Sequence, residues 1–498
     1  MNHTVGVTVS IPPSTPVIVG VGQISFRPDD LSQAVEPLEL MARACEAAAA
    51  DAGSSQLLSS AASIAVVQGA WKYTDPARLL AERWGATAHT IRSTDGGNTP
   101  QSLVNKLAMR IAEGATDIAV IVGAETIWSR RRARRQGIRI PTTDQAPVEP
   151  DEISGSPLDM TDEFETARGI EAPINFYPLF ESAIRYANGE SISDHRDRLS
   201  QLWHGFNEVA VQNPYAWFRT PMTAEEIRNP SPSNRMVGFP YTKAMNSNWD
   251  LDQAAARILC PVETAQQLGI SRDKWVFPLA GTDGADTQKV TNRGALHESP
   301  AIRVAGRRCL ELAGVGPDDI DHVDLYSCFP SAVQIGAREV GFSLNRQLTL
   351  TGGLTFAGGP LNNYVTHSIA TMVQVLRNDP GSKGYVSANG GFVTKHAFGV
   401  YSTEPPANGY WTENCQADID VHPTSVGAPD HVGPVEVEAY TVMYGAEGPE
   451  KLLAACRVRP GVRTWAYSTD AQLMTAATET ELIGRAATVD ADGVLTVD

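Results

Sequence analysis

The sequence predicts an α/β protein made of two similar units, followed by a small β-barrel. Short apolar segments alternate with helical segments through most of the chain, which is typical of a mostly parallel sheet covered on both faces. Two long stretches repeat the same order of strands and helices, and each carries a glycine turn after its third strand–helix pair. We therefore expect an internal duplication.

The first unit begins with residues 16–25, PVIVGVGQIS, an apolar strand that ends in Gly-x-Gly. Because Ser25 stands where a third glycine is needed and no helix follows at once, we exclude a dinucleotide-binding fingerprint. After this strand the unit is expected to run helix, strand, helix, strand, turn, helix and strand, over residues 38–52, 63–68, 76–84, 89–93, 94–98, 100–113 and 117–125.

The alternation stops between residues 126 and 243. This stretch holds an arginine run at 130–135, many prolines and an acidic segment at 149–165, and it predicts a helical insertion that forms a wall of a ligand site. The arginine run is expected to be a solvated loop, with contact to a phosphate-bearing ligand or partner as the alternative. Residues 246–270 then resume the first unit with a strand and a helix.

The second unit leads into the stretch around which the chain is organised, residues 354–401. Its first elements are expected at 275–280, 300–313, 320–326 and 329–340. Gly358, Gly359 and Pro360 then open a helix of about twenty residues, where backbone N–H groups lack internal partners. Gly390 and Gly391 follow the next strand, where backbone can approach a ligand closely. The two turns predict a site built largely from main-chain donors.

The last part of the chain, from residue 404 on, no longer alternates strands with helices. Residues 404–434 are polar and rich in Pro and Gly, which predicts a linker, and the short strands beyond it predict a five- or six-stranded OB-like barrel. The expected domains are an N-terminal half (1–125), an inserted loop domain (126–245), the end of the first half (246–273), a C-terminal half (274–405), a linker (406–432) and the small barrel (433–498).

Composition excludes several classes of protein. A formal net charge of −17 argues against general nucleic-acid affinity, which needs basic surface. Six scattered cysteines without a CxxC pair predict reduced thiols and no metal site. The N-terminal residues lack the basic and apolar regions of a signal peptide, and no stretch is long enough to span a membrane. We expect a soluble, cytoplasmic protein.

The duplicated order, the insertion, the glycine turn before Gln101 and the motif VDLYSCFPSA at 323–332 together resemble the thiolase superfamily. The sterol-carrier-type thiolases and the thiolase-like proteins related to them are most similar, over residues 14–405. The resemblance implies a five-layered α-β-α-β-α fold and the acetyl-CoA acyltransferase class. It also implies an acyl-CoA-type thioester as ligand, with no separate cofactor.

The reactive side chains of that family are replaced in this sequence. Its nucleophilic Cys falls on Gly96, the His of its Gly-His-Pro motif on Gly359, and the acid/base Cys of its Cys-x-Gly motif on Ala388. In the fourth motif Tyr326 replaces Asn or His, whereas Cys328 matches the sterol-carrier version. Thiolysis requires a thiolate that attacks the thioester and a second base, so we expect no thiolase activity.

Some of the family's site is expected to remain. The family builds an oxyanion hole from backbone N–H groups that correspond to Gly96 and Gly390, and such donors do not depend on side-chain identity. The expected substrate-binding residues are Gly96, Asn98, Gly359, Asn363, Asn389 and Gly390. The candidate catalytic residues are Tyr326, Cys328 and His396, and each has a structural alternative as a packed or hydrogen-bonded core residue.

Three functions follow from this pattern. The first is binding of acyl-CoA or a similar thioester without thiolase turnover. The second is retro-aldol cleavage of a β-hydroxyacyl-CoA through Tyr326, since thiolase relatives with a Tyr in the fourth motif do this beside an OB-like partner protein. The third is a non-catalytic scaffold that binds a protein partner through the barrel. Members of the family pair subunits through the edge strand that corresponds to residues 89–93. The substituted turn and the additional barrel are expected to weaken that contact, so the oligomeric state stays open.

Overall fold

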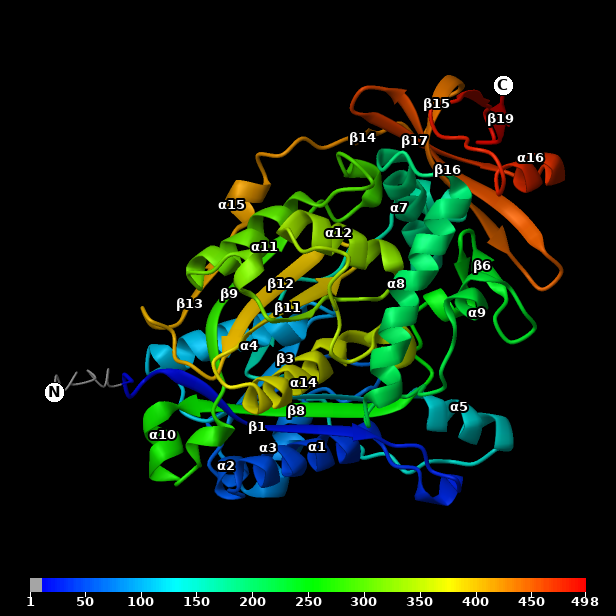
Figure 1. Cartoon of the computed structure of the whole chain (residues 1–498). Coiled ribbons are helices and arrows are strands. Elements are labelled where there is room, and N and C mark those ends of the chain that lie inside the picture. The colour runs from blue at the N-terminus through cyan, green and yellow to red at the C-terminus, as the bar shows by residue number, and fades with distance from the viewer. Residues whose placement is uncertain (1–10) are drawn as a thin grey trace.

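The computed structural model describes residues 11–498, which form two stacked α/β sheets and a smaller β-domain (Figure 1). Residues 1–10, part of the segment in which the sequence predicts no signal peptide, lie outside the described residues. Two helices lie between the sheets and contact both of them, and other helices cover the outer faces. The layers therefore run helices, sheet, helices, sheet, helices.

The first sheet has the strand order β1-β8-β4-β2-β3-β5. Its strands are β1 (Pro16–Ser25), β2 (Ser63–Val66), β3 (His89–Ser93), β4 (Ala119–Thr126), β5 (Glu152–Ser154) and β8 (Asp252–Pro261). The neighbouring helices are α1 (Pro37–Ala52), α2 (Gln56–Ser59), α3 (Pro76–Trp84) and α10 (Val262–Gln267). β5 comes from the insertion and pairs in parallel with β3, so the edge strand expected to meet a second subunit is covered by the chain itself.

The second sheet has the order β10-β11-β12-β9-β13. Its strands are β9 (Phe277–Ala285), β10 (His322–Asp324), β11 (Lys383–Gly390), β12 (Lys395–Ser402) and β13 (Trp411–Asn414), and its outer helices are α11 (Pro300–Leu312) and α12 (Pro330–Val340). The order β10-β11-β12-β9, with one parallel and two antiparallel pairings, repeats the order and directions of β2-β4-β8-β1. The two sheets therefore repeat one arrangement.

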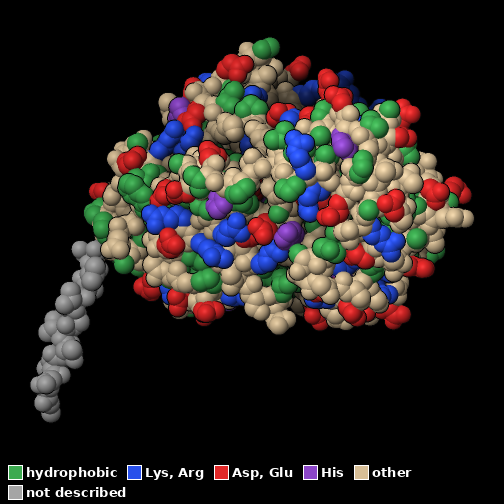
Figure 2. Space-filling view, turned by 90° about the horizontal axis from the view of Figure 1, so that it is seen from above, with side chains coloured by type: hydrophobic (Ala, Val, Ile, Leu, Met, Phe, Trp, Pro, Cys, Tyr) green, Lys and Arg blue, Asp and Glu red, His purple; other side chains and the backbone are tan. Residues whose placement is uncertain are grey.

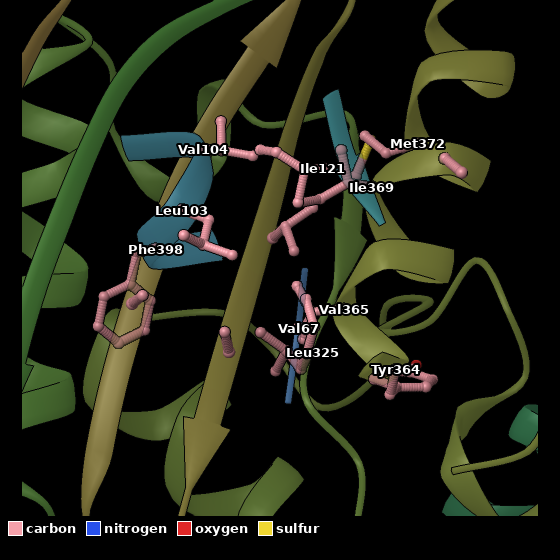
Figure 3. Close-up of a cluster of buried hydrophobic side chains, with 14 of the residues drawn as sticks. Val67, Leu103, Val104, Ile121, Leu325, Tyr364, Val365, Ile369, Met372 and Phe398 are labelled. Carbon is pink, nitrogen blue, oxygen red and sulfur yellow. The ribbon is translucent and has the colours of Figure 1, made fainter. Parts of the chain in front are cut away.

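The central layer consists of α4 (Thr99–Ala112) and α14 (Tyr364–Asn378). Figure 3 shows their side chains beside those of both sheets, including Leu103, Ile121, Ile369 and Phe398, all fully or almost fully buried. Each such side chain stabilises the fold by about 1.5–3 kcal/mol relative to an exposed one. Burial from both sides explains why these helices hold the loops at their ends firmly.

The helix expected to open at the glycine turn 358–360 begins later, at Tyr364. Before it come the short helix α13 (Gly353–Phe356) and the 3₁₀ turn η6 (Leu361–Asn363). Gly358 has a φ of 113° and Leu361 a φ of 47°, and an α-helix cannot continue through left-handed backbone of this kind. The turn and the helix are therefore separate elements.

The insertion is helical, as expected, and the arginine run lies in a helix, which corrects the prediction of a loop. The inserted elements are α5 (Ile127–Gln136), α6 (Glu163–Ala167), α7 (Pro173–Ala187), α8 (Ile192–Gln212), α9 (Ala224–Arg228), β6 (Met236–Gly238) and β7 (Tyr241–Thr242). Arginine favours helices, and Gly137 closes α5 with a φ of 68°. The Arg132 guanidinium also lies 4.2 Å from the ring centre of Trp128, one turn away.

The stretch expected to be a linker is partly structured. Its residues 411–414 form β13, which adds to the second sheet beside β9, and α15 (Gln416–Ile419) follows. The segment WTEN has no apolar run, so its sequence carries no strand signal. The pairing depends on the free edge that β9 offers.

The C-terminal domain is a mostly antiparallel half-barrel, and Met236 and Phe239 of the insertion pack into its hydrophobic core. Its elements are β14 (Val426–Gly427), β15 (Gly433–Tyr444), β16 (Pro449–Arg459), β17 (Val462–Ser468), α16 (Ala471–Ala476), β18 (Ala486–Val489) and β19 (Leu495–Val497). The order is β14-β17-β16-β15-β18-β19, and the two sides meet at a single parallel bridge between Tyr467 and Val494. The closed barrel that the sequence predicts is thus present only in part.

The half-barrel is joined to the rest of the chain by buried contacts. Arg463 is 1% exposed, pairs with Glu438 at 2.7 Å and donates to the backbone carbonyls of Val290, Thr291 and Arg293. On the face seen in Figure 2, acidic and basic side chains are interspersed. None of the helices within residues 11–498 is long and apolar enough to cross a membrane.

Candidate functional site

The two glycine turns predicted from the sequence meet at one point. A Cβ atom on Gly390, at the end of β11, would lie 2.5 Å from Asn98 Oδ1 and 3.1 Å from the Cα of Gly96. Gly96 itself has a φ of 140°, and its carbonyl accepts the N–H and the hydroxyl of Thr99, which start α4. A larger residue at position 390 would displace the Asn98 side chain and crowd the backbone of Gly96 and Gly97, so glycine favours the close approach of the turns.

Gly97 completes the contact. A Cβ atom there would lie 2.3 Å from the Tyr326 hydroxyl oxygen and 2.5 Å from the carbonyl oxygen of Asn389. Gly97 is buried, and its N–H makes no hydrogen bond with the residues that the structure describes, 11–498. Since Gly97 precedes the positive end of α4, the turn offers a backbone donor next to a phenol. The structure thus brings together Gly96, Asn98, Tyr326, Asn389 and Gly390 of the predicted site.

Asn362, which is not among the site residues predicted from the sequence, reaches the turn at Gly96. Its Oδ1 accepts the N–H of Gly96 at 3.0 Å, and its Nδ2 donates to the carbonyl of Gln68 at 2.9 Å and to Asp95 at 3.1 Å. The Gly96 N–H, expected to face an oxyanion, is therefore already paired, and the unpaired donor is at Gly97. Local sequence carries no signal for a contact that spans 266 positions.

The insertion supplies a wall of the site through Tyr177 of α7, which the sequence analysis also missed. Asn389 Nδ2 donates to the Tyr177 hydroxyl at 3.2 Å and lies 3.8 Å from Cys328 Sγ, while Asn389 Oδ1 is buried without a partner in the described chain. The Tyr177 ring stacks on Phe329 with 4.3 Å between ring centres. The sequence predicts that the insertion forms a wall of a ligand site, but it does not indicate that Tyr177 is the residue that contacts Asn389.

Cys328 is buried in this environment, and burial raises the pKa of its thiol to about 12. The thiol therefore stays protonated at neutral pH, and a thiol is a weak nucleophile compared with a thiolate. Burial likewise raises the pKa of the Tyr326 phenol above its ordinary value, so this group is a hydrogen-bond donor at neutral pH.

His396 lies opposite Asn389 in the pairing of β12 with β11. Its side chain is 1% exposed, and burial lowers the pKa of the imidazole to about 4, so the ring is neutral at pH 7. Nε2 has no hydrogen-bond partner in the described chain and lies 3.8 Å from Asp286 Oδ2. His396, Tyr326 and Asn389 line one cavity of about 10 Å³, which is room for about one water molecule.

Two other predicted residues lie away from this cavity. The N–H of Gly359 donates to the carbonyl of Asn248, and a Cβ on Gly359 would lie 3.1 Å from the side chain of Leu354. Asn363 is 2% exposed, donates to the carbonyl of Gly123 at 2.7 Å and accepts the hydroxyl of Thr366. Asn363 thus holds the turn before α14 against β4 of the first sheet, and Gly359 holds it against the segment that precedes β8.

Glu125 holds the backbone at residues 68–70, where the Gln68 carbonyl accepts the Asn362 amide. The ionisation of Glu125 predicts a pH effect on stability. Glu125 Oε1 accepts the N–H of Ala70 at 2.7 Å, and burial raises the pKa of this carboxyl to about 7. An unfolded Glu has a pKa near 4.3, so between these values the folded state binds the extra proton and stability falls as pH rises. Between pH 5 and pH 8 the loss is about 2–3 kcal/mol.

Glu125→Gln is expected to remove most of that loss, because the amide keeps the acceptor for Ala70 and does not ionise. Denaturant unfolding of the parent and the variant at pH 5, 7 and 8 measures the difference. Glu82→Gln, at an exposed position on α3, serves as the control and should leave the pH dependence unchanged. If the free energy of unfolding changes equally with pH in the parent and in Glu125→Gln, the pH effect does not come from Glu125.

Comparison with known proteins agrees with this geometry. No family model matches the chain. The "Acetyl-CoA acetyltransferase" of Methanocaldococcus jannaschii is 24% identical over 267 residues, which are 53% of this chain and span 60% of that relative's length. An Ltp2–ChsH2(DUF35) aldolase shares the fold, with a TM-score of 0.59 and 18% identity over 79% of this chain and 98% of that one.

A third protein matches over the full length. It is a monomeric SCP2-thiolase-like protein type 1 from Mycobacterium smegmatis, with 30% identity and a TM-score of 0.82 over 98% of this chain and 100% of that one. This match includes the insertion and the C-terminal half-barrel. The chain accordingly belongs to the SCP2-thiolase-like proteins of the thiolase superfamily.

Proposed function

We propose that the chain binds an acyl-CoA-type thioester where the two glycine turns meet, and that it does not pass through an acyl-enzyme on a thiol. The observation that carries the proposal is the N–H of the buried Gly97, beside Tyr326, which makes no hydrogen bond within residues 11–498. Two donors that converge at the positive end of α4 suit the carbonyl oxygen of a thioester, which gains negative charge when it reacts.

The thiols of the chain support the absence of acyl transfer. Position 96, where the superfamily carries its nucleophile, is a glycine. Burial raises the pKa of each of the six cysteines, and Cys328, the one at the site, has no charged base beside it. Without a thiolate the first step of thiolysis cannot begin at a useful rate.

Retro-aldol cleavage of a β-hydroxyacyl thioester is the second candidate, favoured by the pair of groups at the small cavity. His396, which is neutral and whose Nε2 has no hydrogen-bond partner among residues 11–498, is the candidate base for the β-hydroxyl proton. As that proton leaves, the bond between the α- and β-carbons breaks, the β-carbon becomes a carbonyl, and the electron pair forms an enolate held by the Gly97 N–H. The Tyr326 phenol then returns a proton to the α-carbon.

The proposal also covers the role of the C-terminal domain and the oligomeric state, which depends on the edge strand β3 that β5 covers. The order β17-β16-β15-β18-β19, closed by the Tyr467–Val494 bridge, supports an OB-like barrel, which in this chain stands in for a separate OB-like partner or binds a protein partner. The pairing of β5 with β3 supports a monomer, the state named for the Mycobacterium smegmatis protein. The cytoplasmic location stays a prediction from the sequence.

Calorimetric titration with CoA, acetyl-CoA and a long branched acyl-CoA tests the binding function. We expect saturable binding that strengthens with the acyl chain, and no thiolysis of acetoacetyl-CoA. Robust thiolysis by the pure protein, or no heat with any ligand, would refute the proposal.

Tyr326→Phe separates the two candidate functions. We expect the variant to bind acyl thioesters within about threefold of the parent, because one hydroxyl contributes a modest net hydrogen bond. Any retro-aldol cleavage of a β-hydroxyacyl-CoA should fall at least about a hundredfold, since proton transfer by a positioned group contributes about 10²–10⁴ in rate. Tyr186→Phe, on the exposed face of α7, is the matched control. Unchanged cleavage in Tyr326→Phe would exclude Tyr326 as the proton donor.

A further inference from the structure

The cavity beside Tyr326 has too little room for an acyl group, but a larger space adjoins it. A groove of about 450 Å³ lies between α4 and the ends of β9, β12 and β13, and Asn98 and His396 line it. This volume lies within the range of about 300–1,000 Å³ that ligand pockets occupy. Because His396 lines both the groove and the small cavity, the two spaces adjoin, and the groove offers room for a bound acyl chain.

One cation in this groove has no acidic partner. Lys395 begins β12, is 6% exposed, and its Nζ donates to the backbone carbonyl of Ser156. No carboxylate of the described chain lies within 4.0 Å of that nitrogen, although Asp95 is near enough to raise its pKa in part. Burial lowers the pKa of Lys395 more than Asp95 raises it, because removal of the ammonium from water disfavours its charged form.

The other charges of the groove are already paired. Lys106 binds Glu152 at 2.5 Å, and Glu413 binds Arg308 at 3.0 Å. The Asp283 carboxylate accepts hydrogen bonds from Ser102 and Asn105, and its burial raises its pKa, which favours the neutral form. None of these groups neutralises Lys395.

Two independent features favour the binding of a ligand's polar end group at this end of the groove. The positive end of the fourteen-residue helix α4 faces the same turn, and Lys395 pairs across the ladder with Gly390, which touches that turn. The His396 Nε2, in a side chain that is 1% exposed, has no partner in the described chain and lines the groove. A buried donor or acceptor without a partner is costly unless a ligand or water pairs with it.

We propose that the groove takes an acyl chain that ends in a carboxylate, so that the natural ligand is the thioester of a dicarboxylic acid. The distal carboxylate pairs with the Lys395 ammonium, and the thioester carbonyl lies at Gly97. This inference rests on the proposed thioester function and names the class of acyl group. A carboxylate beside Lys395 supplies the direct ion pair that no described residue makes with it, and a charge-assisted hydrogen bond of this kind is stronger than a neutral one.

Titration with glutaryl-CoA and pentanoyl-CoA, which have acyl chains of equal length, tests the proposal. For the parent protein we expect glutaryl-CoA to bind at least about tenfold more tightly. Lys395→Met should bring the ratio of the two dissociation constants to about one, whereas Lys395→Arg should keep most of the preference. Lys106→Met is the matched control, because Lys106 lines the same groove but already has an acidic partner.

The outcomes separate this inference from the proposed function. If pentanoyl-CoA binds as tightly as glutaryl-CoA to the parent, the inference is wrong while thioester binding stands. A preference that survives in Lys395→Met overturns it equally, provided that circular dichroism shows the variant to be folded. If neither thioester binds, the proposed function fails and the inference fails with it. If Lys395→Met does not fold, the comparison of Lys395→Arg with the parent decides. The inference is then wrong if glutaryl-CoA binds no more tightly than pentanoyl-CoA to both proteins.

Discussion

Gly97→Ala is expected to abolish thioester binding, with at least a hundredfold loss of affinity, and to destabilise the fold. The added methyl group would lie 2.3 Å from the Tyr326 hydroxyl and 2.5 Å from the Asn389 carbonyl oxygen. The tyrosine side chain can turn away, but the carbonyl belongs to the end of β11 and cannot move without shifting that strand. Overpacking of this kind costs about 1–3 kcal/mol. Titration with a branched acyl-CoA and denaturant unfolding measure the two effects.

Gly205→Ala is the matched control for this substitution. Gly205 lies within α8, and no heavy atom lies within 4 Å of the position that its Cβ would take. Because alanine is the better helix former, this variant should be more stable than the parent by up to about 1 kcal/mol and should bind the thioester unchanged. If Gly97→Ala binds as the parent does, the meeting point of the two turns is not the thioester site.

The fold could be predicted where local signals agree with one another. The predicted bounds of α3 and β3 match the structure, since Asp75 caps α3, Pro76 occupies its first turn and Gly85 ends it in left-handed backbone. The start of α14 could not be located, because the positive φ of Leu361 follows from the packing of the turn before the helix and not from its own residue type. The strand β13 likewise depends on a partner edge far along the chain.

The site could be predicted from its glycines and less well from its polar residues. Gly96 and Gly390 stand out in the sequence because paired glycines after strands favour close backbone approach, and the structure brings them together. Whether an asparagine side chain forms a turn or crosses to another segment depends on tertiary contacts. Asn362 reaches Gly96, whereas the adjacent Asn363 holds Gly123. The protonation of Cys328 and His396 is set by burial, which the sequence does not reveal.

The insertion that carries Tyr177 is held in place by a buried polar network centred on Glu181 of α7. Glu181 is fully buried, and its carboxylate accepts hydrogen bonds from Tyr241 at 2.5 Å and from Gln334 at 2.6 Å, and lies 2.7 Å from His195 Nε2. These partners come from the segment after β6, from α12 and from α8. One carboxylate therefore joins three elements of the inserted domain and the second α/β unit.

Glu181→Ala is expected to destabilise the protein by about 3–5 kcal/mol, because it leaves three buried groups without the acceptor around which they are arranged. Glu208→Ala on α8 is the control, since that carboxylate is 69% exposed and its contact with His204 is 3.6 Å long, so its loss should change stability by less than about 0.5 kcal/mol. Urea unfolding followed by circular dichroism gives both values. Thioester binding by Glu181→Ala should also weaken under conditions where it remains folded, because α7 positions Tyr177 against Asn389. Equal stability of the two variants would mean that apolar packing alone holds the insertion, and the wall of the site would then not depend on this network.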